Sequence, residues 1–126
     1  MEIEYRGGCL CGAVRFALKG RPLRVGLCHC LDCRKASGAP YIMFAVWPVE
    51  ALDVAGEMST FAKRSFCPRC GGRIGWFRND EAEIMIGSLD NAPSCLSPDY
   101  ELWVGRREDW LHRLEWAGQY EDDRRA

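Results

Sequence analysis

Long apolar runs are absent from this chain of 126 residues, and none of its hydrophobic stretches approaches the length needed to span a bilayer. Residues 1–6 also lack the basic and then apolar order of a secretory signal peptide. These two absences predict a cytoplasmic protein without a membrane partner. Thiols stay reduced in the cytoplasm, so stable disulfides are not expected.

A surplus of basic residues is absent as well. The chain has 17 lysines and arginines against 18 aspartates and glutamates, which gives a formal net charge of −1. Binding to nucleic-acid phosphates requires a clustered basic surface, so nucleic acid is not expected as the main partner. Internal repeats, low-complexity segments and linkers are also missing, and we therefore expect one domain over residues 1–126.

Hydrophobic periodicity predicts a β-rich chain. In residues 13–19, Val14, Phe16 and Leu18 share one side and charged residues occupy the other, which is the pattern of a half-buried strand. Further strands are predicted over residues 23–28, 41–47, 72–77, 82–86 and 100–104, and short helices over residues 31–37 and 108–114. Many short strands and little helix favour a mostly β fold of small antiparallel sheets.

Cysteine is abundant, with eight residues in this length. Four disulfides are one interpretation, but the reducing compartment argues against it. Cys9 and Cys11 are also too close in sequence to pair comfortably, as are Cys28 and Cys30. Short-spaced thiols in such a chain are more typical of metal sites, and a small domain of thin sheets gains stability from bound metal. The cysteine pattern therefore predicts metal binding.

Seven cysteines fall into three groups, which are Cys9 and Cys11, then Cys28, Cys30 and Cys33, and then Cys67 and Cys70. On a strand, residues i and i+2 point to the same side, so Cys9 and Cys11 can bind one ion from an extended backbone. Between Cys67 and Cys70 the chain can fold around a metal and point backbone N–H groups at the sulfurs. Gly71 suits the positive φ that such a turn often needs.

Ligand counting indicates two zinc ions. The simplest partition joins Cys9, Cys11, Cys67 and Cys70 into a closed structural site and leaves Cys28, Cys30 and Cys33 as a three-thiolate site with an open position. Sulfur-only ligation fits zinc, and a three-cysteine site is poorly suited to an iron–sulfur cluster. The alternative is a single zinc ion that takes four of the seven thiols and leaves three idle.

Two basic residues directly follow the second cysteine group. Arg34 and Lys35 are candidates to receive an anionic substrate, and the alternative is that they are ordinary surface charges. His29 alternates with same-side cysteines, so on a strand its ring points away from the metal, where it packs or is solvated, and the alternative is that it touches the metal or the substrate. Cys95 stands alone and is expected to be a plain buried thiol, with an approach to the open site as the alternative.

The three cysteine motifs in this order resemble the glutathione-dependent formaldehyde-activating (GFA) family, which also includes centromere protein V. The matching segments are residues 8–14, 28–38 and 64–71, and residues 86–90 with Trp103 and Trp110 are similar to the C-terminal half of the family. The resemblance covers nearly the whole chain. It implies a β-tent of small antiparallel sheets that zinc holds together, with Cys28, Cys30 and Cys33 at the catalytic ion.

The resemblance also implies a carbon–sulfur lyase, which joins glutathione and formaldehyde into S-hydroxymethylglutathione and reverses that addition. An open zinc position can lower the pKa of a thiol or polarise an aldehyde oxygen, and the sequence leaves both open. The partner would then be a small thiol or aldehyde. The alternative is a non-catalytic zinc-binding module for protein or nucleic-acid interaction, as in the centromere-associated relative. The three-thiolate site, and the lack of a long basic stretch, favour the enzyme.

Overall fold

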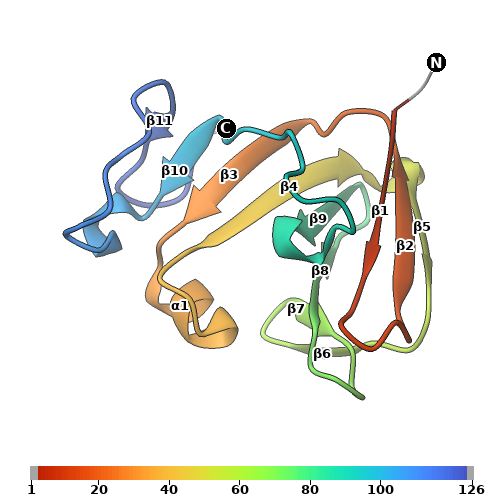
Figure 1. The fold of residues 1–126 in the computed structure, drawn as a ribbon. Coiled ribbons are helices and arrows are strands. Elements are labelled where there is room, and N and C mark those ends of the chain that lie inside the picture. The colour runs from red at the N-terminus through yellow and green to blue at the C-terminus, as the bar shows by residue number, and fades with distance from the viewer. Residues whose placement is uncertain (1–2, 125–126) are drawn as a thin grey trace.

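The computed structural model describes residues 3–124, and the chain is mostly β, as the sequence predicts (Figure 1). Strands β1, β2 and β5 stand side by side at one end of the molecule, and the segment with β10 and β11 forms the other end. The strands are β1 (Glu4–Gly8), β2 (Arg15–Lys19), β3 (Arg24–Cys28), β4 (Ile42–Pro48), β5 (Leu52–Ala55), β6 (Ser59–Phe61), β7 (Arg64–Phe66), β8 (Arg73–Phe77), β9 (Glu81–Met85), β10 (Tyr100–Leu102) and β11 (Gly118–Gln119). The α-helix is α1 (Leu31–Ser37), and short 3-10 helices are η1 (Val49–Ala51), η2 (Ile86–Ser88) and η3 (Val104–Arg106).

The strands form two sheets of unequal size. One has the order β1-β2-β5, and the other has the order β11-β10-β3-β4-β9-β8-β7-β6. The pairings are antiparallel except at β10, which lies parallel to both β3 and β11. Asp99 fixes this arrangement, because its carboxylate accepts from Val25 N at 2.8 Å and its own N–H donates to Val25 O at 2.7 Å. The parallel pairings lie outside the antiparallel pattern that the sequence predicted.

Alternation along the strands separates two hydrophobic clusters. On β4 and β9, Ala45, Trp47 and Ile84 belong to one cluster, whereas Val46 and Met85 belong to the other. Successive residues of a strand face opposite sides of a sheet, so both faces of these strands are covered. The first cluster includes Cys9 and Cys67, and the second includes Cys28. Each group of cysteines is thereby attached to its own part of the core.

The helix expected over residues 31–37 is confirmed as α1, with Cys30 at its N-cap and the Gly38 N–H bonded to Arg34 O at 2.8 Å. The helix expected over residues 108–114 is wrong, because the segment forms turns and bends. Trp110 is 65% exposed there, so no apolar helix face is buried. The Leu114 N–H bonds the Glu101 carboxylate at 2.9 Å instead of a helical carbonyl.

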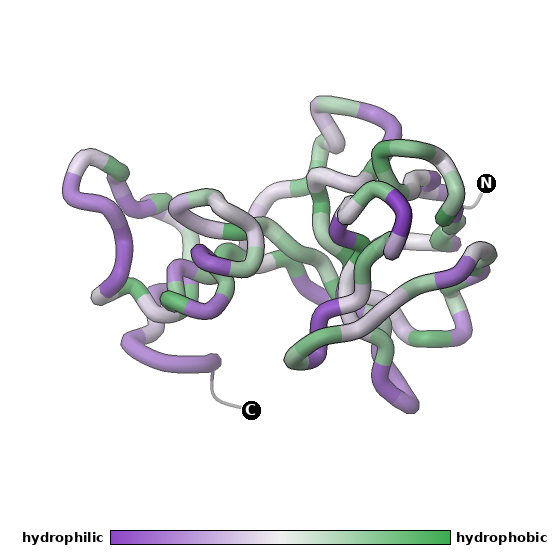
Figure 2. The backbone as a smooth tube through the Cα atoms, turned by 90° about the horizontal axis from the view of Figure 1, so that it is seen from below, coloured by the Kyte–Doolittle hydropathy of each residue, from purple (hydrophilic) through white to green (hydrophobic). Residues whose placement is uncertain are grey.

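Hydropathy follows this layout. Figure 2 shows long hydrophilic stretches at the end of the molecule where the C-terminus lies, and segments of mixed hydropathy in the rest of the chain. Within residues 3–124, no helix is both long and apolar enough to cross a membrane.

Candidate metal centres and the adjoining cavity

The first cysteine cluster joins the turn after β1 to the turn before β8. The sulfurs of Cys9, Cys11, Cys67 and Cys70 all lie within 4.8 Å of one another. Cys9 Sγ is 3.7 Å from Cys11 Sγ, and Cys11 Sγ is 3.8 Å from Cys67 Sγ. These separations are far too long for disulfides, whose sulfurs lie about 2.0 Å apart. Four sulfurs bound at about 2.3 Å around a tetrahedral zinc ion lie about 3.8 Å apart, so the spacing fits zinc.

Backbone N–H groups surround these sulfurs. The N–H of Val14 lies 3.2 Å from Cys9 Sγ, that of Arg69 lies 3.4 Å from Cys67 Sγ, and that of Gly72 lies 3.4 Å from Cys70 Sγ. The hydrogen bond from Val14 is the main reason that the pKa of the Cys9 thiol is lowered to about 6. Donors fixed in this way favour thiolates, the form that binds metal.

Gly71 has φ of 78°, which allows the chain to turn back after Cys70, as the sequence predicted.

The second cluster lies at the junction of β3 and α1. Cys28 ends β3, Cys30 caps the helix and Cys33 lies in its first turn, and their sulfurs are within 4.8 Å of one another. The Cys30 sulfur accepts from the Cys33 N–H at 3.3 Å, so one of the proposed ligands is also the helix cap. The Cys28 side chain is buried, whereas Cys30 and Cys33 are partly exposed. Three sulfurs with an accessible side are a suitable donor set for an ion with one open position.

Arg64 lies beside this second cluster, and sequence reasoning did not select it. Its Nη2 is 3.7 Å from Cys33 Sγ, and its Nη1 donates to Ala62 O at 2.8 Å. The pKa of the Cys33 thiol is lowered to about 5 by hydrogen bonding with Cys28, against the effect of burial, and Cys30 and Arg64 lower it further. The signal in the sequence was weak, because Arg64 precedes the third cysteine group and is remote from Cys33 along the chain.

A cavity of about 350 Å³ opens beside Cys33. Its lining includes the basic residues Lys63, Arg64, Arg73 and Arg78 and the acidic residues Glu83 and Asp123. Burial raises the pKa of the Glu83 carboxyl, which favours its protonated form. The volume is within the range of small-molecule sites, about 300 to 1,000 Å³. A cavity with this balance of charges suits an anionic ligand that also carries a positive or hydrogen-bonding group.

Arg34 and Lys35 line a different depression, together with Leu31 and Trp110. Arg34 Nη1 is 2.8 Å from the Glu108 carboxylate and 3.1 Å from Arg106 O. Neither residue belongs to the lining of the cavity beside Cys33. Their role in substrate binding stays a prediction. Lys63 and Arg64, in contrast, do line the cavity beside Cys33.

His29 is not part of the three-sulfur cluster. Its side chain is fully buried, and Nε2 lies 2.8 Å from Glu101 Oε1. The sequence-based expectation that Cys95 is buried is wrong, since this thiol is exposed in a loop. Cys95 also belongs to neither cluster of sulfurs.

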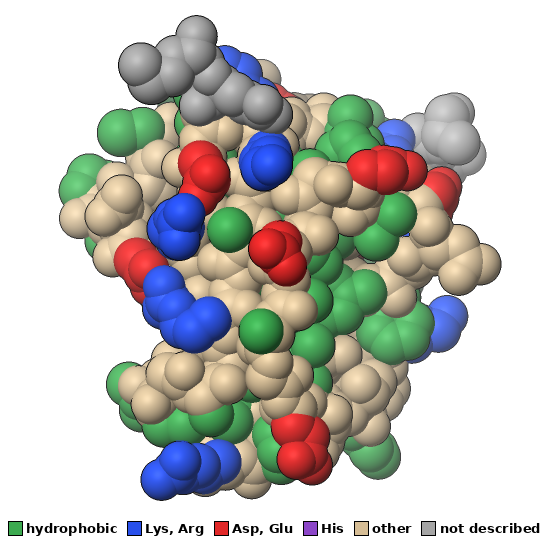
Figure 3. Space-filling model, turned by 90° about the vertical axis from the view of Figure 1, so that its right-hand side faces the viewer, with side chains coloured by type: hydrophobic (Ala, Val, Ile, Leu, Met, Phe, Trp, Pro, Cys, Tyr) green, Lys and Arg blue, Asp and Glu red, His purple; other side chains and the backbone are tan. Residues whose placement is uncertain are grey.

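Charges of both signs cover the molecular face that carries the three-stranded sheet. Figure 3 shows basic and acidic side chains interspersed on this face, with hydrophobic side chains between them. A surface for nucleic-acid phosphates needs basic groups gathered together, and this face does not provide one.

Comparison with known proteins agrees with the cysteine pattern. The family described as "Glutathione-dependent formaldehyde-activating enzyme" matches residues 4–106. A relative from Schizosaccharomyces pombe (strain 972 / ATCC 24843), named as an uncharacterized lyase, is 33% identical over 73 residues, which cover 54% of this chain and 53% of the relative. The match thus spans about half of that protein's length. A crystal structure of a Rhodobacter sphaeroides protein has a similar fold, with a TM-score of 0.54 and 21% identity, covering 71% of this chain and 91% of the other.

Proposed function

Because the chain belongs to the glutathione-dependent formaldehyde-activating family, we propose that it is a zinc-dependent carbon–sulfur lyase. Its reaction joins a small thiol to an aldehyde, such as glutathione to formaldehyde, and reverses that addition. The observation that carries this proposal is the position of Cys33, which belongs to the three-sulfur cluster and also lines the cavity of about 350 Å³. A substrate in that cavity lies against the donor set with the open side.

The chemistry is an addition to a carbonyl. The thiolate sulfur attacks the aldehyde carbon, one C–S bond forms, the C=O π bond breaks and the oxygen takes up a proton. The reverse reaction breaks the C–S bond and returns the electron pair to sulfur. A zinc ion held by Cys28, Cys30 and Cys33 would supply Lewis acidity and affinity for sulfur.

The residues of the chain supply binding and proton exchange. Arg64 offsets the negative charge of the thiolates, since its guanidinium contacts Cys33 Sγ. Lys63 and Arg78 lie on the same cavity wall and can attract the carboxylates of a thiol such as glutathione. Glu83 is a carboxyl of this wall with a raised pKa, so it can exchange a proton with the substrate oxygen.

Exchange spectroscopy tests the function directly. ¹³C-formaldehyde and glutathione interconvert slowly with their adduct, and the zinc-loaded protein is expected to accelerate that exchange. Cys30→Ser should abolish the acceleration, and Cys95→Ser should retain it, because Cys95 lies in neither cluster. If the protein accelerates exchange with neither glutathione nor any of a panel of small thiols, the lyase proposal fails and the non-catalytic zinc module replaces it.

A further inference from the structure

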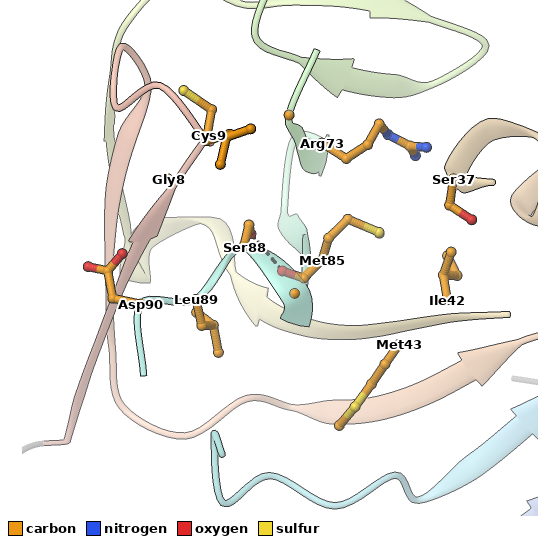
Figure 4. A pocket seen from close by; sticks show the side chains of 13 residues that line it. Gly8, Cys9, Ser37, Ile42, Met43, Arg73, Met85, Ser88, Leu89 and Asp90 are labelled. Carbon is orange, nitrogen blue, oxygen red and sulfur yellow. Dashed lines mark hydrogen bonds between the residues drawn. The ribbon is translucent and has the colours of Figure 1, made fainter. Parts of the chain in front are cut away.

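A second and larger cavity, of about 550 Å³, lies between the first cysteine cluster and the end of α1 (Figure 4). Its apolar lining comes from Ile42, Met43, Met85 and Leu89. Figure 4 shows the thioether of Met85 reaching into the middle of the site and Arg73 extending toward Ser37 on the opposite wall. Methionine side chains adapt to irregular ligands, so the lining suits a small organic group.

Arg73 is the feature of this cavity that core packing does not explain. Its Nε and Nη1 are buried and have no hydrogen-bond partner among the residues that the structure describes. Burial lowers the pKa of the guanidinium, and the positive charge of Arg64 lowers it further. A buried donor without an acceptor is costly, and more so when it is charged. Nε and Nη1 of Arg73 are therefore available to donate hydrogen bonds to a bound anion.

Within the larger cavity, the lining offers little that competes for Arg73. Asp90, an acidic residue of the same wall, is already paired, because its Oδ1 accepts from Arg15 Nη1 at 2.9 Å. Outside this cavity, the charged neighbours of Arg73 are Arg64, Cys33 and Glu83, and its Nε and Nη1 bond none of them. Burial raises the pKa of the Glu83 carboxyl, which favours the neutral form of that neighbour. An arginine fork pairs most closely with a planar carboxylate, through two parallel hydrogen bonds.

Arg73 also connects the two cavities. Together with Ile42 and Met85 it lines both the larger cavity and the one beside Cys33. An anion held by its guanidinium is thus adjacent to the three-sulfur cluster while its apolar body occupies the larger space.

We propose that the cavity of about 550 Å³ binds an organic carboxylate with a short apolar body, and that Arg73 holds the carboxylate. The further identification of this ligand as the thiol substrate rests on the proposed function. In that case the preferred substrate is a thiol with its carboxylate at Arg73 between the two cavities, its sulfur in the Cys33 cavity and its apolar group in the larger cavity. The apolar lining favours such a compound over a fully polar thiol.

Binding of hexanoate tests the site without any chemistry, because hexanoate contains no sulfur. In zinc-loaded protein with ¹³C-labelled methionine methyl groups, hexanoate should shift the signals of Met43 and Met85. It should leave the signal of Met58 in place, because Met58 does not line the cavity. Its neutral counterpart, 1-hexanol, should bind at least about tenfold more weakly, since it lacks the charge-assisted bonds to arginine. Equal binding of the two compounds would overturn the proposal, and so would shifts that miss both methionines of the cavity. Neither result requires a variant.

Two variants locate the carboxylate. Arg73→Leu should weaken hexanoate by at least about tenfold and change 1-hexanol little. Arg21→Leu is the matched control, because Arg21 is exposed in the turn after β2, and it should bind hexanoate as the wild type does. If Arg73→Leu retains the full preference for hexanoate, a different group holds the carboxylate and the assignment is wrong.

A kinetic comparison separates the site from the function. For 3-mercaptopropionate against 3-mercapto-1-propanol, Arg73→Leu should raise the KM of the carboxylated thiol selectively. Hexanoate binding without any adduct exchange would refute the lyase function and leave the carboxylate site standing. If the protein binds hexanoate at Arg73 but exchanges both thiols with the same kinetics, only the assignment of the ligand as the thiol substrate is refuted.

Discussion

His29 Nε2 and Glu101 Oε1 lie 2.8 Å apart, and both side chains are almost completely buried. The other carboxylate oxygen, Glu101 Oε2, accepts from the Leu114 N–H at 2.9 Å and from Gln119 Nε2 at 2.8 Å. The His29 backbone N–H in turn donates to Leu102 O at 3.1 Å. This network fixes the residue between Cys28 and Cys30, and it links the second cysteine cluster to β10 and β11. The C-terminal segment therefore supports the geometry of a site to which it contributes no sulfur.

The first prediction is that Glu101→Gln destabilises the fold. The amide cannot accept at both positions, so its NH₂ group faces the donors of Leu114, Gln119 or His29. We expect a loss of about 2 kcal/mol in the free energy of unfolding, measured by urea denaturation of zinc-loaded protein. Glu115→Gln is the control, because the side chain of Glu115 is 81% exposed and should change stability by less than about 0.5 kcal/mol. Equal losses in both variants would show that the network contributes nothing.

The pair of His29 and Glu101 also makes the free energy of unfolding depend on pH. Burial alone would raise the pKa of the Glu101 carboxyl, but hydrogen bonds from Gln119, Leu114 and His29 outweigh burial and lower this pKa. A group with a lowered pKa in the folded state stabilises that state above its unfolded value, about 4.3, and the contribution is lost as the pH falls through the folded value. The difference between wild type and Glu101→Gln should thus be constant near neutral pH and shrink below about pH 4.

The second prediction concerns metal content. Freshly purified, reduced protein should contain two zinc equivalents per chain by elemental analysis, because two separate clusters of sulfurs have suitable donor sets. Cys67→Ser should lose the ion of the first cluster, and Cys95→Ser should keep both. One equivalent or fewer in protein handled without chelators would contradict the partition into four and three ligands.

The third prediction is that the two clusters differ in what they stabilise. Cys67 is buried and its cluster links β1 to β8, so Cys67→Ser should lower the melting temperature strongly. Cys30→Ser should have a milder effect on melting and should abolish adduct exchange, because the second cluster has three sulfurs and partly exposed ligands. Thermal melts of the two variants at equal zinc concentration provide the comparison. Similar losses of melting temperature would remove the distinction between a structural and a catalytic site.

Local pattern in the sequence was sufficient for much of the fold. The alternation that predicted a strand over residues 13–19 is confirmed in β2, where Phe16 and Leu18 are buried. The helix over residues 31–37 is confirmed because its cap and stop signals are local as well. The segment over residues 108–114 has helical periodicity, but Trp110 on its apolar side is 65% exposed, and propensity alone does not hold so short a helix in water. Periodicity does not show whether the apolar side of a segment is buried in the folded protein.

Contacts remote in sequence explain what was missed at the site. The cysteines could be grouped from their spacing, because each group is contained in a few residues. Arg64 is 31 positions from Cys33, and Glu101 is 72 from His29, so no spacing rule connects them. The parallel pairing of β3 with β10 brings Glu101 beside Leu27 and next to Cys28. A long segment separates β3 from β10 in the sequence, so the register of their pairing can be seen only in the three-dimensional structure.

The fourth prediction assigns proton exchange to Glu83. Glu83→Gln keeps the size of the side chain but removes the ionisable group, so kcat for adduct exchange should fall by about a hundredfold, with little change in zinc content. Glu57→Gln is the matched control at an exposed position and should retain activity. If kcat of Glu83→Gln equals that of the wild type, another group or solvent exchanges the proton.

The last prediction is spectroscopic and concerns the open side of the second cluster. Cys28, Cys30 and Cys33 would supply three of the four ligands that a tetrahedral ion usually takes. A sulfur-rich site prefers a soft fourth ligand, and a small thiol is the soft ligand that the cavity beside Cys33 can admit. In cobalt-substituted protein, glutathione should therefore change the visible and charge-transfer bands. Cys30→Ser should abolish that response, and Cys95→Ser should preserve it. A spectrum that millimolar glutathione and other small thiols leave unchanged would remove the binding step on which the lyase proposal depends.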